Sequence, residues 1–150
     1  MDGLDFHRAT LAWKCDGLSD VELRRRSMPP SSLSLLGLVR HMAEVERHWF
    51  RRVIAGETIR HVWSEDADFQ AAYDVQGSGR DDAFTAWCSE IERSRRIEQH
   101  ISTLDQTFLV EAWGCEASLR TVLLHLIHDY ARHNGHADLL REGVDGTAGA

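Results

Sequence analysis

Apolar residues recur at alternating steps of three and four along four stretches of the chain, which is the spacing of helices that bury one face. These stretches predict long helices over about residues 4–15, 31–56, 81–101 and 118–142. A short helix is also predicted after Gly17, because Ser19 and Glu22 have the spacing of a capping box. The sequence therefore predicts an all-α fold, a four-helix bundle with a long loop between its second and third helices.

The segments between the predicted helices include one that is much longer than an ordinary turn. Residues 57–79 are acidic and irregular, and we expect a surface loop of a kind that often has a function. The aromatic rings of this loop are expected to pack it against the protein: Trp63, Phe69 and Tyr73. Residues 107–113 are predicted to be extended. We expect one domain over residues 1–142 and a flexible tail over 143–150.

Polar residues interrupt the apolar stripe of the last predicted helix. In chain order, its inner face consists of Leu119, Val122, Leu126, Asp129, His133, His136 and Leu140. Burying polar groups without partners is unfavourable, so something must satisfy these side chains. Asp129 and His133 are one helical turn apart and reach a common point in front of the helix. A shared metal ion is the most economical explanation for this pair.

A third ligand is predicted on the second long helix. His41 falls between Leu38 and Val45 on the apolar face of that helix. His48 has nearly the same angular position but lies about 10 Å further along the axis, so one ion cannot bind both histidines. We favour His41, because more core residues flank it. A shared ion requires the imidazoles of His41 and His133 to lie within about 8 Å of each other.

The residues alone leave two interpretations of this pattern open. A histidine on an apolar face is more often a hydrogen-bonded core residue than a metal ligand. Two histidines and an acid on matching helix faces raise the metal site to an equal alternative. The histidines outside these faces are expected to be exposed, with a contact between subunits as the alternative for the last of them: His7, His61, His100 and His128.

Several residues near the predicted ligands are candidates to line a pocket. His125 and His136 flank the acid and histidine of the last helix by about one turn, with buried polar packing as the alternative role. His48 is a further pocket candidate, and Trp49 is either a core residue or part of the pocket wall.

The formal net charge of −7 argues against nucleic acid as a partner, because phosphate contacts need a basic face. Arg132 and Arg141 either hold an anionic thiol or pair with acids, and we favour surface pairs with Glu44, Glu46 or Glu142. Phosphate-binding loops, the GxSxG motif and CxxC pairs do not occur in the sequence.

The cysteines are far apart and have no neighbouring histidine, so a cysteine nucleophile is not favoured: Cys15, Cys88 and Cys115. Such separated cysteines are typical of the reducing cytoplasm. The sequence has no signal-like segment and no apolar run of membrane-spanning length. We therefore expect a cytoplasmic protein without a membrane partner.

Two segments, LVRHMAEVERHWF (38–50) and LHLIHDYARHNGHADLLRE (124–142), resemble the DinB superfamily. They are most similar to its DUF664 branch, related to the metal-binding domain of mycothiol-dependent maleylpyruvate isomerase and to the YfiT-like proteins. The resemblance implies a four-helix bundle whose divalent metal is bound by one histidine of the second helix and two residues of the last. These positions are His41, Asp129 and His133 here. The middle ligand is Glu or His in relatives, and Asp129 is shorter than Glu, which implies longer-range binding, a bridging water or a small helix shift.

Three protein ligands leave an open coordination position, which is typical of a catalytic site. The resemblance implies that a small thiol such as mycothiol is a co-substrate and attacks an electrophile as thiolate, in an S-transferase or isomerase reaction. A metal-dependent hydrolase and a non-catalytic metal-binding protein remain alternatives. Two imidazoles and a carboxylate suit zinc, nickel, iron or manganese, and we favour zinc or nickel. The resemblance also implies a homodimer.

Overall fold

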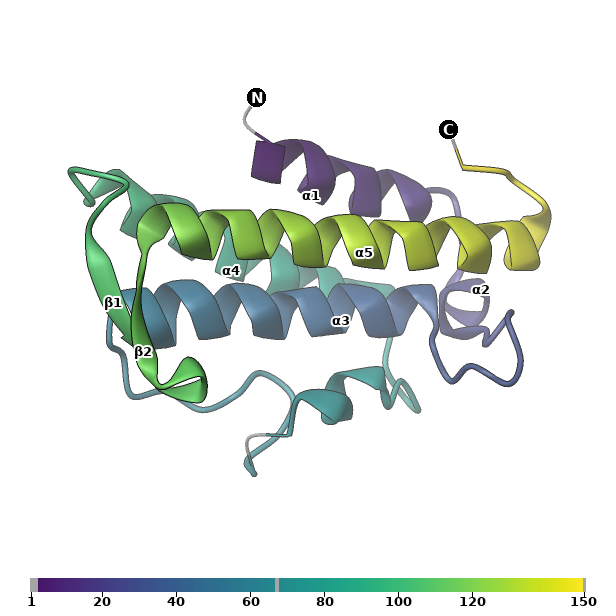
Figure 1. Ribbon diagram of the computed structural model, residues 1–150. Coiled ribbons are helices and arrows are strands. Elements are labelled where there is room, and N and C mark those ends of the chain that lie inside the picture. The colour runs from purple at the N-terminus through teal and green to yellow at the C-terminus, as the bar shows by residue number, and fades with distance from the viewer. Residues whose placement is uncertain (1–2, 67, 150) are drawn as a thin grey trace.

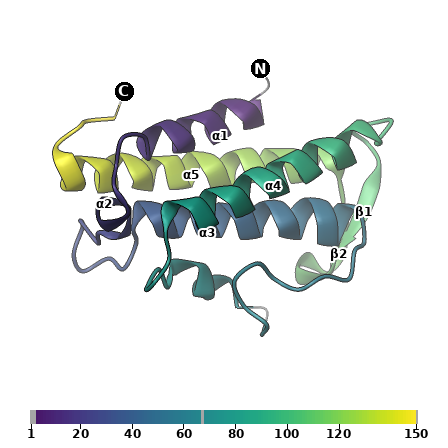
Figure 2. The ribbon, with the colours of Figure 1, turned by 180° about the vertical axis from the view of Figure 1, so that it is seen from behind.

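Helices account for most of the computed structural model, which describes residues 3–66 and 68–149 (Figure 1). The long helices are α1 (Gly3–Lys14), α3 (Leu35–Glu46), α4 (Arg80–Gln99) and α5 (Leu119–Asp145). The short helix α2 (Asp20–Arg24) follows α1, and α3 continues directly into a π-helical segment, η1 (Arg47–Ile54). Helix α3 packs against α4 and α5, and α1 packs along α5 (Figure 1); Figure 2 shows α4 from the opposite side. The predicted long helices are therefore confirmed.

Serine side chains begin three of the helices, and the helix predicted from about residue 31 begins after Ser34. Ser34 caps α3 and Ser118 caps α5, each accepting a hydrogen bond from the backbone N–H three residues later, at 3.1 and 3.2 Å. Ser19 and Glu22 form the reciprocal capping box that begins α2. These caps satisfy backbone donors that would otherwise have no partner within the helix.

Helix α5 extends beyond its predicted end at residue 142. It runs to Asp145, so the first three residues of the predicted flexible tail are helical. The residue that adopts the left-handed conformation and ends the helix is Gly146, with φ of 77°.

A small antiparallel hairpin corrects the expectation of an all-α fold. Strand β1 (Thr107–Val110) pairs with β2 (Cys115–Ser118), with Thr107 opposite Ser118. The turn between the strands is a single 3₁₀ turn, η3 (Glu111–Trp113), which Gly114 closes at φ of 65°. The sequence predicts the first extended segment but not the second, because Cys115–Ser118 is only four residues long and has no β-branched or aromatic residue.

One buried polar network connects the four long helices. The guanidinium of Arg8 (α1) donates to both carboxylate oxygens of Glu46 (α3), at 2.8 and 2.9 Å. The hydroxyl of Tyr130 (α5) donates to the same carboxylate at 2.7 Å, and the indole N–H of Trp87 (α4) donates to Tyr130 at 2.9 Å. All four residues are buried, so the prediction that Glu46 is a surface residue is wrong. Glu44 is buried as well.

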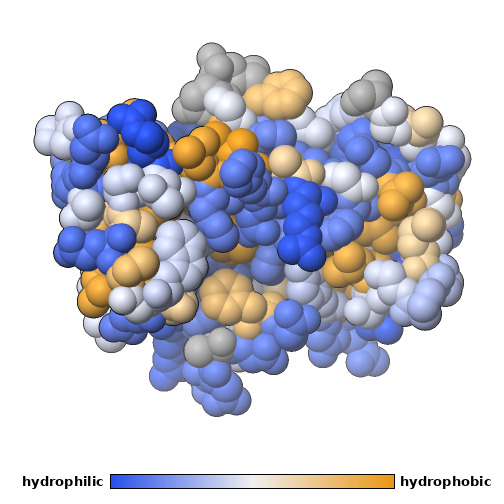
Figure 3. All heavy atoms as spheres, viewed as in Figure 1, coloured by the Kyte–Doolittle hydropathy of each residue, from blue (hydrophilic) through white to orange (hydrophobic). Residues whose placement is uncertain are grey.

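The face of the molecule in Figure 3 is mostly hydrophilic, with hydrophobic residues in separate small groups. The cysteines are free, with Cys15 buried and Cys88 and Cys115 exposed. No helix within the described residues has the length and apolar character needed to cross a membrane.

Candidate metal centre

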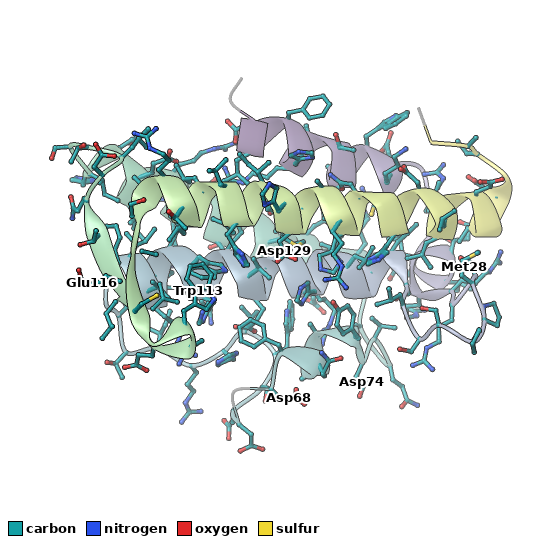
Figure 4. The ribbon with its side chains drawn as sticks, viewed as in Figure 1. Met28, Asp68, Asp74, Trp113, Glu116 and Asp129 are labelled. Carbon is teal, nitrogen blue, oxygen red and sulfur yellow. The ribbon has the colours of Figure 1, made fainter. Side chains whose placement is uncertain are left out.

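Three side chains from two helices meet where α3 and α5 lie next to each other. His41 extends from α3, and Asp129 and His133 extend from α5. Each offers one ligand atom, and these atoms all lie within 4.8 Å of one another. The ring centroids of His41 and His133 are 4.7 Å apart, inside the predicted limit of about 8 Å. Figure 4 shows Asp129 on the side of α5 that faces α3.

The surroundings of these groups fit a divalent cation. The Nδ1 atom of His41 is buried and has no hydrogen-bond partner among the described residues. Burial, and then the nearby His133, lower the pKa of His41 to about 4, so this imidazole is neutral at pH 7. Burial raises the pKa of Asp129, but the hydrogen bond and charge of His133 outweigh it and the net shift is downward. A neutral imidazole and an ionised carboxylate are the protonation states that metal binding requires.

The shorter side chain of Asp129 does not keep it out of the group. Its Oδ1 atom lies 3.3 Å from Nε2 of His133. The other ring nitrogen of His133 lies 3.4 Å from Nδ1 of His136. A partner on the second nitrogen fixes the ring orientation of a metal-binding histidine. His136, a pocket candidate from the sequence, is therefore in direct contact with the group.

Two rings of the loop between η1 and α4 contact His41. Both belong to the 3₁₀ helix η2 (Phe69–Tyr73). The ring of Tyr73 stacks on His41, with centroids 5.1 Å apart and an angle of 21° between the planes. The ring of Phe69 approaches His41 edge-on at 6.5 Å. The sequence predicts only loop packing for these rings, because helical periodicity does not indicate where a loop folds back.

Polar side chains of α3 hold this loop in place. Arg40 donates hydrogen bonds to the carbonyl of Ala72 and to the hydroxyl of Ser78, both at 2.8 Å. The buried carboxylate of Glu44 accepts hydrogen bonds from the backbone N–H groups of residues 62 and 63, at 2.7 and 3.3 Å. Because these residues lie on the helix that supplies His41, the loop is fixed relative to the candidate ligand.

The remaining histidines divide between surface and interior. His100 and His128 are exposed, as predicted. His61 is only 8% exposed and its Nδ1 lies 3.1 Å from the carboxylate of Glu44, so the prediction of a surface histidine is wrong there. His7 is half-buried against α5. The carboxylate that His61 contacts belongs to Glu44 of α3, and sequence spacing does not indicate this contact.

The pocket candidates His48, Trp49 and His125 lie beside the three-residue group rather than in it. The rings of Trp49 and His125 are 4.8 Å apart. The ring centroid of His48 lies 5.3 Å from that of Trp49 and 5.4 Å from that of Phe69. Trp113 of the hairpin, which sequence reasoning does not single out, contacts both Trp49 and His125.

The stability of the metal-free protein is expected to fall on acidification through His48. Burial, and then the positive charges of Arg52 and His61, lower the pKa of His48 from 6.5 to about 4. The unfolded chain therefore binds a proton more readily than the folded chain, and the free energy of unfolding falls as pH drops from about 6.5 to 4. Allowing for partial exposure, we expect a loss of up to about 2 kcal/mol. Urea denaturation across this pH range measures it.

The matched comparison replaces one histidine at a time by phenylalanine. His48→Phe is expected to flatten the pH dependence of stability, whereas the same substitution at the exposed His128 leaves it unchanged. Equal slopes in the wild type and His48→Phe would show that His48 does not contribute.

Comparison with known families assigns the chain. The family model described as mycothiol-S-transferase matches residues 1–146, a span that includes His41, Asp129 and His133. No curated protein matches the chain. The family match covers far more than half of the sequence and extends across every helix and strand described above. The chain therefore belongs to the mycothiol-S-transferase family of DinB-like proteins.

Proposed function

We propose that this protein is a metal-dependent S-transferase that uses mycothiol or a similar small thiol. The main support is the convergence of His41, Asp129 and His133 in a chain of the mycothiol-S-transferase family. The proposed cofactor is a divalent cation, zinc or nickel, and the second substrate is a small organic electrophile.

The residues of the site have separate tasks in this proposal. His41, Asp129 and His133 would hold the cation, and three protein ligands would leave a coordination position for the thiol. When bound, the cation acts as a Lewis acid that keeps a coordinated thiol deprotonated near neutral pH. Asp129 contributes a single negative charge, and the rings of Tyr73 and Phe69 exclude water from one side of His41.

The proposed reaction is a nucleophilic substitution at carbon. The thiol sulfur forms a bond to a carbon of the electrophile, and the leaving group departs with the electron pair of its bond to that carbon. The thiol proton passes to solvent when the thiolate forms. For addition to an activated double bond, the same proton ends on the carbon next to the new bond.

Cobalt-substituted protein tests the proposal even while the natural electrophile is unidentified. We expect mycothiol to add a sulfur-to-cobalt charge-transfer band to the absorption spectrum, saturating at one thiol per chain. We also expect conjugation of nitrobenzyl chloride to mycothiol to require both metal and thiol. Cobalt that is bound but spectrally insensitive to mycothiol would contradict the proposal.

Metal-loaded protein also distinguishes the S-transferase from the two alternative functions. Metal-dependent turnover of esters or amides without thiol would replace the proposal by a hydrolase. A metal-dependent rise in melting temperature with neither activity would replace it by a non-catalytic metal-binding protein.

Finer assignments accompany the proposal: the family branch, the bundle and the dimer rest on the resemblance of residues 38–50 and 124–142 to known families, and the location and excluded partners rest on cysteine spacing, apolar run length and net charge. We propose that the chain is closest to the DUF664 branch and that its long helices form the four-helix bundle of that group. We further propose a homodimer located in the cytoplasm, with no nucleic-acid or membrane partner. The pocket roles of His48, His125, His136 and Trp49 are proposals of the same kind.

A further inference from the structure

Three aromatic rings from three different elements form one contiguous cluster beside the candidate metal centre. Trp49 (η1), Trp113 (η3) and His125 (α5) are in mutual contact, with ring centroids 4.8 to 5.3 Å apart. The planes are inclined to one another by 53° to 75°, so the rings are not stacked flat upon each other. We call this set the aromatic wall.

The aromatic wall continues to the candidate ligands without a break. His125 lies one helical turn before Asp129 on α5. On the side of α3, a chain of ring contacts connects the two groups. The ring centroids of His41 and Phe69 are 6.5 Å apart. The ring of His48 is 5.4 Å from that of Phe69 and 5.3 Å from that of Trp49. A group bound on the aromatic wall is therefore about one to two helical turns from the atoms that would hold the cation.

Trp113 is the exposed member of the aromatic wall. Trp113 is 41% exposed, whereas Trp49 is only 6% exposed, so Trp113 supplies the accessible ring face of the aromatic wall. The turn that positions it is closed by Gly114, whose N–H donates to the carbonyls of Val110 and Glu111 at 3.0 and 3.1 Å. Figure 4 shows Trp113 and Asp129 on the same face of the molecule, where α3 and α5 lie side by side.

The chemistry of this surface selects for a flat apolar ligand. Burial lowers the pKa of the adjoining His48 to about 4, so that ring has no charge at neutral pH. The indole faces of the aromatic wall stack with another aromatic ring more favourably than with an aliphatic chain of similar size. We propose that the aromatic wall of Trp49, Trp113 and His125 binds an aromatic ring of the electrophile and so makes the protein selective for aromatic electrophiles.

This inference rests on the proposed S-transferase function, and it assigns the substrate class of that site. In the expected reaction a benzylic carbon forms the new bond to the thiol sulfur while chloride leaves with the electron pair. The ring of the benzylic substrate contacts the aromatic wall, and its reactive carbon points toward His41 and Asp129.

Ligand binding tests the inference without catalysis. Fluorine NMR titrations measure the Kd of trifluoromethylbenzyl alcohol and of the aliphatic trifluorobutanol, neither of which reacts with thiols. We expect Trp113→Leu to weaken binding of the aromatic probe by about five- to tenfold, and Trp113→Phe by about two- to threefold. Binding of the aliphatic probe is expected to stay within twofold in both variants.

Trp13 provides the matched control, because it is 52% exposed on α1 and has no part in the aromatic wall. Trp13→Leu is expected to leave both Kd values unchanged. The inference is overturned if Trp113→Leu changes the Kd of the aromatic probe by less than twofold, or weakens both probes equally.

Kinetics with two electrophiles complete the test. Trp113→Leu is expected to raise KM for nitrobenzyl chloride about tenfold, with kcat and the KM for chloroacetamide little changed. The cobalt spectrum with mycothiol reports the proposed function separately. An unaltered spectrum together with unaltered aromatic binding would therefore reject the aromatic wall and leave the S-transferase proposal standing.

Discussion

Replacing His133 by alanine is expected to lower the affinity of the protein for zinc by more than about a hundredfold. Removing a residue that merely orients a ligand already reduces metal affinity by about 10–100-fold, and His133 is proposed as a ligand itself. Its ring is 4.7 Å from that of His41 and its Nε2 is 3.3 Å from Asp129, so no other described histidine has an equivalent place. Competition with a chromophoric chelator measures the affinity, and elemental analysis gives the stoichiometry.

His128→Ala is the control for this experiment, because His128 lies on the same helix with an exposed side chain. It is expected to bind zinc like the wild type, while His41→Ala behaves like His133→Ala. Thiol transfer is expected to be undetectable in both ligand variants. One equivalent of tightly bound zinc in His133→Ala would contradict the assignment of the three-residue group as the metal centre.

The largest expected effect on stability comes from Arg8 rather than from the metal centre. Arg8→Ala leaves the fully buried carboxylate of Glu46 without its cationic partner, and Tyr130 supplies a single hydrogen bond in compensation. Removing one partner of a buried ion pair destabilises a protein by about 3–5 kcal/mol. We therefore expect Arg8→Ala to lower the free energy of unfolding by this amount, measured by urea denaturation.

Two comparisons make the interpretation specific. Arg120 pairs with Asp105 on the surface, and Arg120→Ala is expected to change the stability by less than about 1 kcal/mol. The double variant Arg8→Met with Glu46→Leu is expected to recover much of the lost stability, because no buried charge then remains unpaired. A loss below about 1 kcal/mol in Arg8→Ala would show that water or another group compensates Glu46.

The part of the fold that sequence reasoning predicted depends on local periodicity. Helix faces and caps follow from spacing within one element, so the start at Ser118 was predictable, and the start of α3 was predictable to within a few residues. The same periodicity brought out His41, Asp129 and His133, because polar residues on an apolar stripe need an explanation. Their mutual approach across two helices agrees with the distance that the pattern required.

The contacts that the sequence does not predict join elements far apart in the chain. Glu44 and Glu46 look like surface acids on an amphipathic helix, yet their partners His61 and Arg8 come from a loop and from α1. Tyr73 reaches His41 because the loop folds back along α3. Such pairs are 17 to 38 residues apart in sequence, and neither helical nor strand periodicity relates the two members.

The helix formed by α3 and η1 is continuous, but its two parts have different roles. The α-helical part carries the candidate ligand His41, and the π-helical part carries Trp49 of the aromatic wall. A π turn accommodates an extra residue in an α-helix, and it begins here after the turn that supplies His41. Gain or loss of a single residue between Glu46 and Trp49 would rotate Trp49 to another face of the helix, while the register of His41 against α5 stayed the same. Substrate preference could thus diversify among relatives, or be re-engineered, by length changes at this segment without disturbing the ion-binding geometry.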